Sequence, residues 1–377
     1  MGMWIGRNRK ARVTYGFDEI ALVPGRVTIN PNEVDITCRW PRKEADPLVL
    51  KIPILASAMD GVVDVRFAIA MSKLGGLAVL NLEGVQTRYK NPQEVLQKIY
   101  QEPVQKDLIA ARIRQIKDGG ALAAVSSIPQ RAAEFGKIAE EAGADVFVVQ
   151  STVSTVRHIS SEYKSLDLEK FCREMRIPVI VGNTVGYDVT FEIMECGPAA
   201  VLIGVGPGAA CTSRGVLGLG VPQVTATVDC AAARDAYFKK TSRYVPIITD
   251  GGMSKGGDVC KALACGADAV MVGSAFAKAQ EAPGCGYHWG MATPHANLPR
   301  GTRIKVGATG SLKQILFGPA EVDDGSQNLV GAITTCMGNV GARTIAELQQ
   351  TEIIIAPSIK TEGKLFQTVQ SVGMGSG

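Results

Sequence analysis

The phrases "EAGADVFVV" (141–149), "ECGPAAVLI" (195–203) and "ACGADAVMV" (264–272) repeat one structural unit along this chain. Each phrase reads as the end of a helix, a glycine suited to a left-handed helix terminus, a turn and a short strand. The strands are continuous apolar runs, which is typical of parallel strands covered by helices. The repeated unit therefore predicts an α/β protein built around a parallel sheet.

Similar apolar runs occur on either side of these phrases. The expected strands are 52–56, 77–80, 121–125, 145–149, 178–181, 199–203, 246–249 and 269–272. Amphipathic patterns between them predict helices at 64–73, 131–142, 188–196, 221–236 and 258–265. Eight strands alternating with helices over about 220 residues predict a (β/α)8 TIM barrel. A doubly wound sheet would place a G-x-G-x-x-G turn after its first strand, where this chain has "ASAMDGVV" (56–63).

The composition narrows the functional classes. Of the 377 residues, 46% are hydrophobic, which excludes a disordered chain, and the net charge of +4 comes without a concentrated basic stripe. No apolar run reaches the roughly 18–20 residues that span a bilayer. The nine cysteines are odd in number and form no C-x-x-C pair, which argues against a disulfide framework and a zinc site. We expect a cytoplasmic protein with no nucleic-acid or membrane partner.

The glycines that follow the last two strands predict a phosphate site. In a TIM barrel the loops after the strands form the active site. The seventh strand leads into Asp250, Gly251 and Gly252, and the eighth into Gly273 and Ser274. Glycines here let backbone N–H groups approach phosphate oxygens, and a short helix starting at Ser274 adds its positive end. Asp250 is placed to accept hydrogen bonds from ribose hydroxyls. Tight βα turns without a ligand are the alternative.

The loop after the sixth strand carries the sharpest chemical signal. It reads "GVGPGAACTSRGVLGLGVPQ" (204–223), with six glycines and with Cys211 at its apex beside Thr212, Ser213 and Arg214. A thiol among backbone N–H groups and near an arginine has the surroundings of a nucleophile. A structural cysteine in a glycine-rich turn is the alternative.

Together with this loop, four further segments resemble the IMP dehydrogenase/GMP reductase family in order and spacing. They are "SAMDGVVD" (57–64), "VIVGNTV" (179–185), "ITDGGMSKGGDVCKALACGADAVMVGS" (248–274) and "TTCMGNVGARTIAEL" (334–348). The resemblance runs from about residue 14 to residue 356. It implies one catalytic (β/α)8 domain over 1–377, without the CBS modules that members insert after the second strand. The short connection 81–120 stands in their place, and 285–305 is a shortened flap.

The resemblance implies an NAD-dependent IMP dehydrogenase of guanine nucleotide biosynthesis. Cys211 adds to C2 of IMP, hydride leaves for NAD, and water hydrolyses the thioimidate to release XMP. Ser213 corresponds to a hydroxyl residue that assists this chemistry. The family also implies a homotetramer or a homo-octamer.

The other site residues implied by the resemblance form three groups. The IMP-binding positions are Ser57, Met59, Asn183, Gly208, Asp250, Gly251, Gly252, Gly273, Ser274, Gly290 and Met291. The NAD-binding positions are Gln150, Ser151, Thr152, Gly204 and Gly206. The backbone carbonyls of Gly206, Gly208 and Cys211 correspond to a monovalent cation site, which would hold K⁺. His288 is a further candidate for the lining of the pocket.

The chain departs from the family pattern at several positions. The family's cofactor-ribose Asp is Gln150, its phosphate Ser before the nucleophile is Ala209, and the acidic or amide residue near the end of the flap is Arg300. The flap also lacks the Arg-Tyr pair that activates water. Arg88 and Tyr89, adjacent in the 81–120 connection, are a hypothetical replacement. A solvated connector is the alternative.

Three other functions stay open. GMP reductases, which convert GMP to IMP with NADPH, place a His-Lys pair after the second strand, where this chain has Asn81 and Leu82. A catalytically silent paralogue that binds a purine nucleotide is suggested by the departures above. An FMN-dependent barrel oxidoreductase would share the phosphate turns but not the Cys211 loop.

Overall fold

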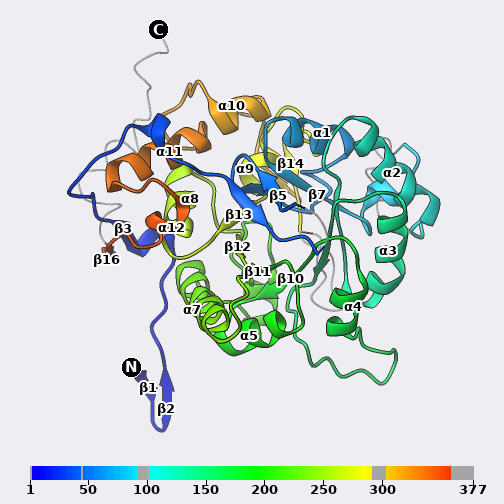
Figure 1. The fold of residues 1–377 in the computed structure, drawn as a ribbon, viewed down its shortest axis with the longest axis horizontal. Coiled ribbons are helices and arrows are strands. Elements are labelled where there is room, and N and C mark those ends of the chain that lie inside the picture. The colour runs from blue at the N-terminus through cyan, green and yellow to red at the C-terminus, as the bar shows by residue number, and fades with distance from the viewer. Residues whose placement is uncertain (1, 44–45, 92–99, 101, 291–302, 358–377) are drawn as a thin grey trace.

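The computed structural model describes residues 2–43, 46–91, 100, 102–290 and 303–357. Eight parallel strands pair in chain order, and the last pairs with the first to close a barrel (Figure 1). In chain order they are β6 (Ile54–Ala56), β7 (Leu77–Asn81), β8 (Ala124–Ser127), β9 (Val146–Gln150), β10 (Val179–Thr184), β11 (Ala200–Ile203), β12 (Ile247–Asp250) and β13 (Ala269–Val272). The prediction of a TIM barrel is confirmed.

The third strand begins later than the sequence predicted. We expected it at 121–125, and pairing with β7 and β9 begins at Ala124. Ala121 and Ala123 are as deeply buried as the strand itself. Because burial continues across the boundary, an apolar run could not mark where hydrogen bonding starts.

Helices surround the barrel, as the alternating pattern predicted (Figure 1). They are α1 (Val65–Lys73), α2 (Lys106–Asp118), α3 (Pro129–Glu141), α4 (Leu168–Glu174), α5 (Tyr187–Glu195), α7 (Gln223–Thr241), α8 (Gly256–Ala264) and α9 (Ser274–Ala277), with α6 (Ser213–Leu217) inside the loop after β11. The five helices that we expected are all present, with ends shifted by a few residues. Asp64 shows why α1 begins where it does, since its side chain accepts a hydrogen bond from the Phe67 N–H.

Alternate residues of each strand face two separate cores. In β9, Val146 and Val148 belong to the core inside the barrel, whereas Phe147 and Val149 pack towards the helices. The inner core also includes the hairpin of β4 (Cys38–Trp40) and β5 (Leu48–Leu50), whose Trp40 is completely buried. This hairpin fills one end of the barrel, so the loops after the strands are left to form a site at the other end.

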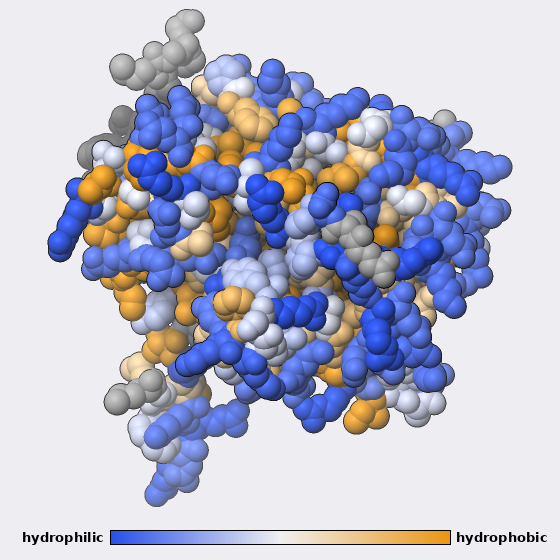
Figure 2. All heavy atoms as spheres, in the orientation of Figure 1, coloured by the Kyte–Doolittle hydropathy of each residue, from blue (hydrophilic) through white to orange (hydrophobic). Residues whose placement is uncertain are grey.

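The remaining elements lie outside the barrel. They are the hairpin β1 (Met3–Gly6) and β2 (Arg9–Ala11), the pair β3 (Ile20–Leu22) and β16 (Ile353–Ile355), the pair β14 (Tyr287–His288) and β15 (Ile304–Lys305), the helices α10 (Leu312–Phe317), α11 (Leu329–Val340) and α12 (Ile345–Leu348), and the short 3-10 turns η1 (Phe17–Glu19), η2 (Pro31–Glu33) and η3 (Val85–Thr87). Figure 2 shows a mostly hydrophilic face with smaller apolar patches. Among the described helices, none is long and apolar enough to cross a membrane.

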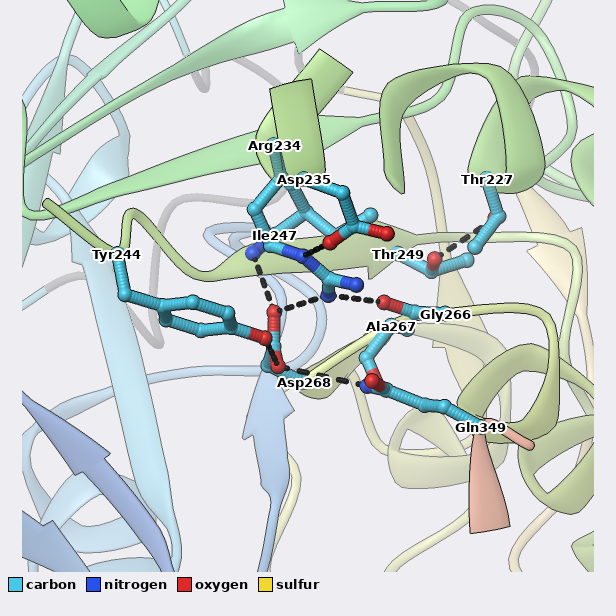
Figure 3. A network of polar contacts seen from close by, with 10 residues as sticks. All are labelled: Thr227, Arg234, Asp235, Tyr244, Ile247, Thr249, Gly266, Ala267, Asp268 and Gln349. Carbon is cyan, nitrogen blue, oxygen red and sulfur yellow. Dashed lines mark hydrogen bonds and ion pairs between the residues drawn. The ribbon is translucent and has the colours of Figure 1, made fainter. Parts of the chain in front are cut away.

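A buried ion pair fastens the amino-terminal ends of the last two strands (Figure 3). Arg234 on α7, 4% exposed, donates to the Asp268 carboxylate at 3.0 Å and to the Gly266 carbonyl at 2.6 Å. Asp268 also accepts from the Tyr244 hydroxyl at 2.6 Å and from the Ile247 N–H at 2.9 Å. This network ties α7 to β12 and β13 at the end of the barrel opposite the candidate site, so we assign it a role in stability.

Candidate active site

Three barrel strands bring residues at their carboxyl ends together around the carboxylate of Asp250. Its Oδ2 accepts hydrogen bonds from Asn183 Nδ2 at 2.8 Å and from Gln150 Nε2 at 3.1 Å. The Gln150 amide also donates to Asn183 Oδ1 at 3.1 Å. Burial raises the pKa of Asp250 to about 6, against the opposing effect of hydrogen bonds from Asn183 and Ser57. Asp250 is therefore a shared acceptor at the centre of the site, ionised at neutral pH.

The Cys211 loop lies directly on the turn after β12. Gly251 and Gly252 have φ of 82° and 80°, a left-handed conformation that favours glycine. A Cβ at Gly251 would lie 3.3 Å from Pro207 Cγ and 3.5 Å from the Gly208 nitrogen, and one at Gly252 would lie 3.1 Å from Pro207 Cβ. The two glycine-rich segments that the sequence singled out thus meet in space.

Gln223 fixes the start of this loop, a role that the sequence analysis missed. Its Nε2 donates to the carbonyls of Ile203 at 2.8 Å and Asp250 at 2.9 Å, and the residue is only 3% exposed. At Gly204, where φ is 143°, a Cβ would lie 2.4 Å from the Asp250 carbonyl oxygen. Gln223, the last residue of the 204–223 segment, therefore holds the first residues of this loop against β12. No local sequence pattern marks that function.

Cys211 is exposed at the apex of the loop. Its N–H donates to the Gly208 carbonyl at 2.9 Å, and its thiol donates to the Ser213 hydroxyl at 3.4 Å. Arg214 Nη2 donates to the Val221 carbonyl at 2.9 Å. The thiol therefore has a hydroxyl neighbour, as predicted, while the neighbouring guanidinium braces the end of the loop.

The turn after β13 lies beside the residues that follow β6. A Cβ at Gly273 would be 2.9 Å from Met59 Sδ and 3.5 Å from Ser57 Oγ. Ser274 begins α9, as expected, and its Oγ lies 3.1 Å from His288 Nε2. Burial lowers the pKa of His288, and its Nδ1 has no hydrogen-bond partner among the described residues. These contacts bring Gly273, Ser274, Ser57 and Met59 into one place, with His288 beside them.

The loop after β9 offers uncharged polar groups next to Asp250. Ser151 Oγ donates to the Val153 carbonyl at 2.8 Å and lies 3.0 Å from Ser154 Oγ. Thr152 is partly exposed on the same loop. Together with the Gln150 carboxamide, these groups offer uncharged hydrogen-bond donors and acceptors beside Asp250.

The connection between β7 and β8 holds Arg88 in place. Its Nε donates to the Glu83 carbonyl at 3.0 Å and its Nη1 to the Glu102 carbonyl at 2.5 Å. The Tyr89 carbonyl accepts from Arg112 Nη2 at 3.1 Å. The loop is therefore fastened to α2. Of the other predicted positions, Gly290 is the last described residue before 291–302, and Met291 and Arg300 lie outside the described residues.

A separate cavity of about 560 Å³ lies at the amino-terminal ends of β10 and β11, lined by Val179 and several cations. Lys43 Nζ donates to three carbonyls at the end of α4, and Arg243 Nη2 donates to the carbonyls of Gly197 and Pro198. Because these two cations serve helix ends, we assign no ligand to this cavity.

Comparison with known proteins gives matches over most of the chain. The model of the IMP dehydrogenase/GMP reductase domain matches residues 14–363. An uncharacterized oxidoreductase of Mycolicibacterium smegmatis is 35% identical over 375 residues, covering 93% of this chain and 99% of that protein. The inosine-5′-monophosphate dehydrogenase of Cryptosporidium parvum is 30% identical, covering 88% of this chain and 89% of that protein. The crystal structure of an IMP dehydrogenase/GMP reductase-like protein from Corynebacterium glutamicum is 33% identical, with a TM-score of 0.86, and covers 94% of this chain and 97% of that one.

Proposed function

The chain belongs to the IMP dehydrogenase/GMP reductase family of oxidoreductases, and from this premise we propose that it is an IMP dehydrogenase, which oxidises IMP to XMP with NAD. The contact of the Cys211 loop with the Asp250–Gly252 turn carries the proposal. It brings the loop that carries the exposed Cys211 thiol against the turn that follows Asp250, a partly buried carboxylate of the kind that accepts hydrogen bonds from ribose hydroxyls. We propose that the domain spans 1–377, with 81–120 and 285–305 as the short connection and flap.

In the proposed reaction the Cys211 thiol, as thiolate, forms a bond to C2 of the hypoxanthine ring. Hydride leaves C2, which produces a thioimidate between Cys211 and the purine. Water then breaks the C–S bond, which returns the thiol and releases XMP and a proton. The Ser213 hydroxyl, 3.4 Å from the sulfur, is the group that would assist proton movement at this atom.

The nucleotide would be held by residues from five strands. Asp250 accepts hydrogen bonds from the ribose, while backbone N–H groups of Gly251, Gly252, Gly273 and Ser274 bind the phosphate. The other contacts proposed for the nucleotide are Ser57, Met59, Asn183, Gly208, Gly290 and Met291. Supporting this assignment, Asn183 and Ser57 already hydrogen-bond to Asp250.

The cofactor proposed for the reaction is NAD, which supplies a hydride acceptor when bound. Gln150, Ser151 and Thr152 would hold its ribose through uncharged hydrogen bonds, with Gly204 and Gly206 alongside. A K⁺ ion would take the backbone carbonyls of Gly206, Gly208 and Cys211, and the Gly208 carbonyl already accepts the Cys211 N–H. We also propose a cytoplasmic homotetramer or homo-octamer.

Arg88 and Tyr89 remain the proposed replacement for the missing water-activating pair. Their contacts with Glu83, Glu102 and Arg112 support an ordered connector. Replacing Arg88 by Ala is expected to slow hydrolysis of the thioimidate, so that the covalent adduct accumulates during turnover. Wild-type rates of both hydride transfer and hydrolysis in this variant would exclude the idea.

GMP reductase is the second candidate, and the residues after β7 weigh against it. Asn81 uses its side chain to accept the Glu83 N–H at 2.8 Å, and Leu82 is completely buried. Neither side chain is placed to carry a proton to leaving ammonia. An FMN-dependent reaction is disfavoured by the exposed Cys211 and would give a yellow protein.

One experiment separates these functions. Purified protein is mixed with IMP and NAD over a range of K⁺ concentrations, while NADH absorbance and the intact mass are followed. NADH formation and a covalent adduct that is lost in Cys211→Ser support the proposal. Oxidation of NADPH with GMP would support the reductase. No turnover and no adduct would leave a silent nucleotide-binding protein.

A further inference from the structure

The buried carboxylate of Asp60 connects the β7–β8 connection to the loop after β6. Asp60 is 3% exposed and follows Met59 directly. Its Oδ2 accepts from the Tyr100 hydroxyl at 2.9 Å and from the Val85 N–H at 3.0 Å. A Cβ at Gly84 would lie 1.9 Å from Asp60 Oδ1, so the connector backbone closes tightly over the carboxylate. The partly buried Tyr100 hydroxyl therefore donates to a buried carboxyl group across the two loops.

The Tyr100 hydroxyl is engaged on both sides. While it donates to Asp60, it accepts from the indole N–H of Trp289 at 2.8 Å. The Arg88 guanidinium lies 5.9 Å from the centre of the Tyr100 ring. A hydroxyl that donates to a carboxylate is polarised into a better acceptor, so each of these two bonds strengthens the other.

Trp289 carries this link onward to the Cys211 loop. Its indole is 5% exposed and lies under the Arg303 guanidinium, 5.2 Å from the ring centre. The next residue, Gly290, packs so closely on the loop that a Cβ there would lie 2.8 Å from the Ala210 carbonyl oxygen. Ala210 immediately precedes Cys211. A continuous set of contacts thus runs from the connector to the residue beside the thiol.

We propose that Tyr100 is a positioning residue: its hydroxyl holds Trp289 and Gly290 against Ala210 and so fixes the Cys211 loop. The inference rests on the proposed function only in taking Cys211 as the reactive thiol. The connection between β7 and β8 then has a function of its own, because it supplies the Tyr100 hydroxyl at the centre of these contacts. Without that hydroxyl, the indole N–H and the Asp60 oxygen each lose a hydrogen-bond partner in a largely buried place.

Tyr100→Phe tests this directly, because it removes the hydroxyl and keeps the ring under Arg88. The matched control is Tyr163→Phe, whose hydroxyl bonds to Gln130 and His158 on an exposed loop. In the full-length protein, we expect Tyr100→Phe to speed amide hydrogen exchange in 204–220 about tenfold, with the barrel strands unchanged. The kcat for IMP falls by a similar factor and its KM stays within about twofold, since the nucleotide contacts remain. Tyr163→Phe changes none of these values.

A second variant tests whether the contacts act as one chain. Trp289→Phe removes the indole N–H, and the double variant Tyr100→Phe/Trp289→Phe should exchange no faster in 204–220 than the faster single variant. Additive effects would overturn the proposed chain. Unchanged exchange at 204–220 in Tyr100→Phe, or faster exchange throughout the barrel, would overturn the positioning role. If the wild-type protein does not oxidise IMP, the proposed function fails, while the exchange data still decide what Tyr100 does.

Discussion

Replacing Asp250 by Asn is expected to stabilise the protein at pH 8 while weakening its binding of IMP. Burial raises the pKa of this carboxyl from 3.8 to about 6. At 1.36 kcal/mol per pKa unit, the ionised group costs the folded protein about 3 kcal/mol. Water still reaches part of the residue, which reduces the expected gain to about 1–2 kcal/mol. An asparagine oxygen can still accept from Asn183 and Gln150, so the substitution removes the charge and keeps these hydrogen bonds.

The effect of Asp250→Asn on the free energy of unfolding depends on pH. The pKa of Asp250 is raised in the folded state, so its contribution to stability is present below the unfolded pKa of 3.8 and is lost as the pH rises through about 6. Wild-type protein thus recovers stability as the pH falls from 8 to 5, and Asp250→Asn does not. The advantage of the variant should shrink by about 1 kcal/mol over this range.

Urea unfolding at pH 8 and pH 5 measures the difference from the midpoint and slope. Asp118→Asn, at an exposed position on α2, is the matched control and should leave the midpoint unchanged. Calorimetric titration with IMP should show about 10–100-fold weaker binding in Asp250→Asn, because a charge-assisted hydrogen bond is lost. A variant that is no more stable at pH 8, or whose advantage is equal at both pH values, would refute the reasoning about burial.

Three further substitutions probe the other contacts. Asp268→Asn leaves Arg234 buried without its main carboxylate, so the free energy of unfolding in urea should fall by about 3 kcal/mol. The kcat should not change, and a fall in kcat would show that the network also acts on the active site. Gln223→Ala removes the hydrogen bonds that hold the Cys211 loop to β12, so the free energy of unfolding should fall by about 1–3 kcal/mol and kcat should fall. A kcat equal to that of the wild type would contradict this role. Gln150→Glu places a second carboxylate next to that of Asp250, and the repulsion between the two charges raises the pKa of the pair. The pH midpoint for IMP binding should therefore rise above about 6. An unchanged midpoint would contradict the contact between residues 150 and 250.

The barrel could be predicted because its signals are local. Each unit of about thirty residues contains an apolar run, a helical pattern and a glycine at the end of the helix. Each strand can therefore be recognised from its own sequence, without knowledge of the strands that pair with it. The hairpin at the bottom of the barrel was not predicted. Its strands, Cys38–Trp40 and Leu48–Leu50, are three residues each, and only contact with the inner core shows why Trp40 is buried.

The clustering of several candidate site residues could be predicted from their positions relative to the strands. Asp250 and Asn183 lie at the carboxyl ends of β12 and β10, and Cys211 lies in the loop after β11, so the topology brings these segments to one end of the barrel. Tyr100 was not predictable, since its partner Trp289 lies 189 residues away and nothing in the connector marks a buried hydroxyl. Such residues act through partners that the sequence does not place.

Gln150 shows how a departure from the family pattern acquires a physical meaning once its contacts are known. From the sequence, a neutral residue in place of a carboxylate reads as a weaker hold on the cofactor. In the structure its amide reaches Asp250 Oδ2 at 3.1 Å, beside the hydrogen bond from Asn183. An aspartate at this position is one methylene shorter and has no donor, and its charge would raise the pKa of Asp250 further. The glutamine therefore helps to keep the one central carboxylate ionised at neutral pH, which is the form that the proposed ribose contact requires. On the proposed function, the exchange would weaken one ribose contact and support another, as expected for an intact nucleotide site beside an altered cofactor site.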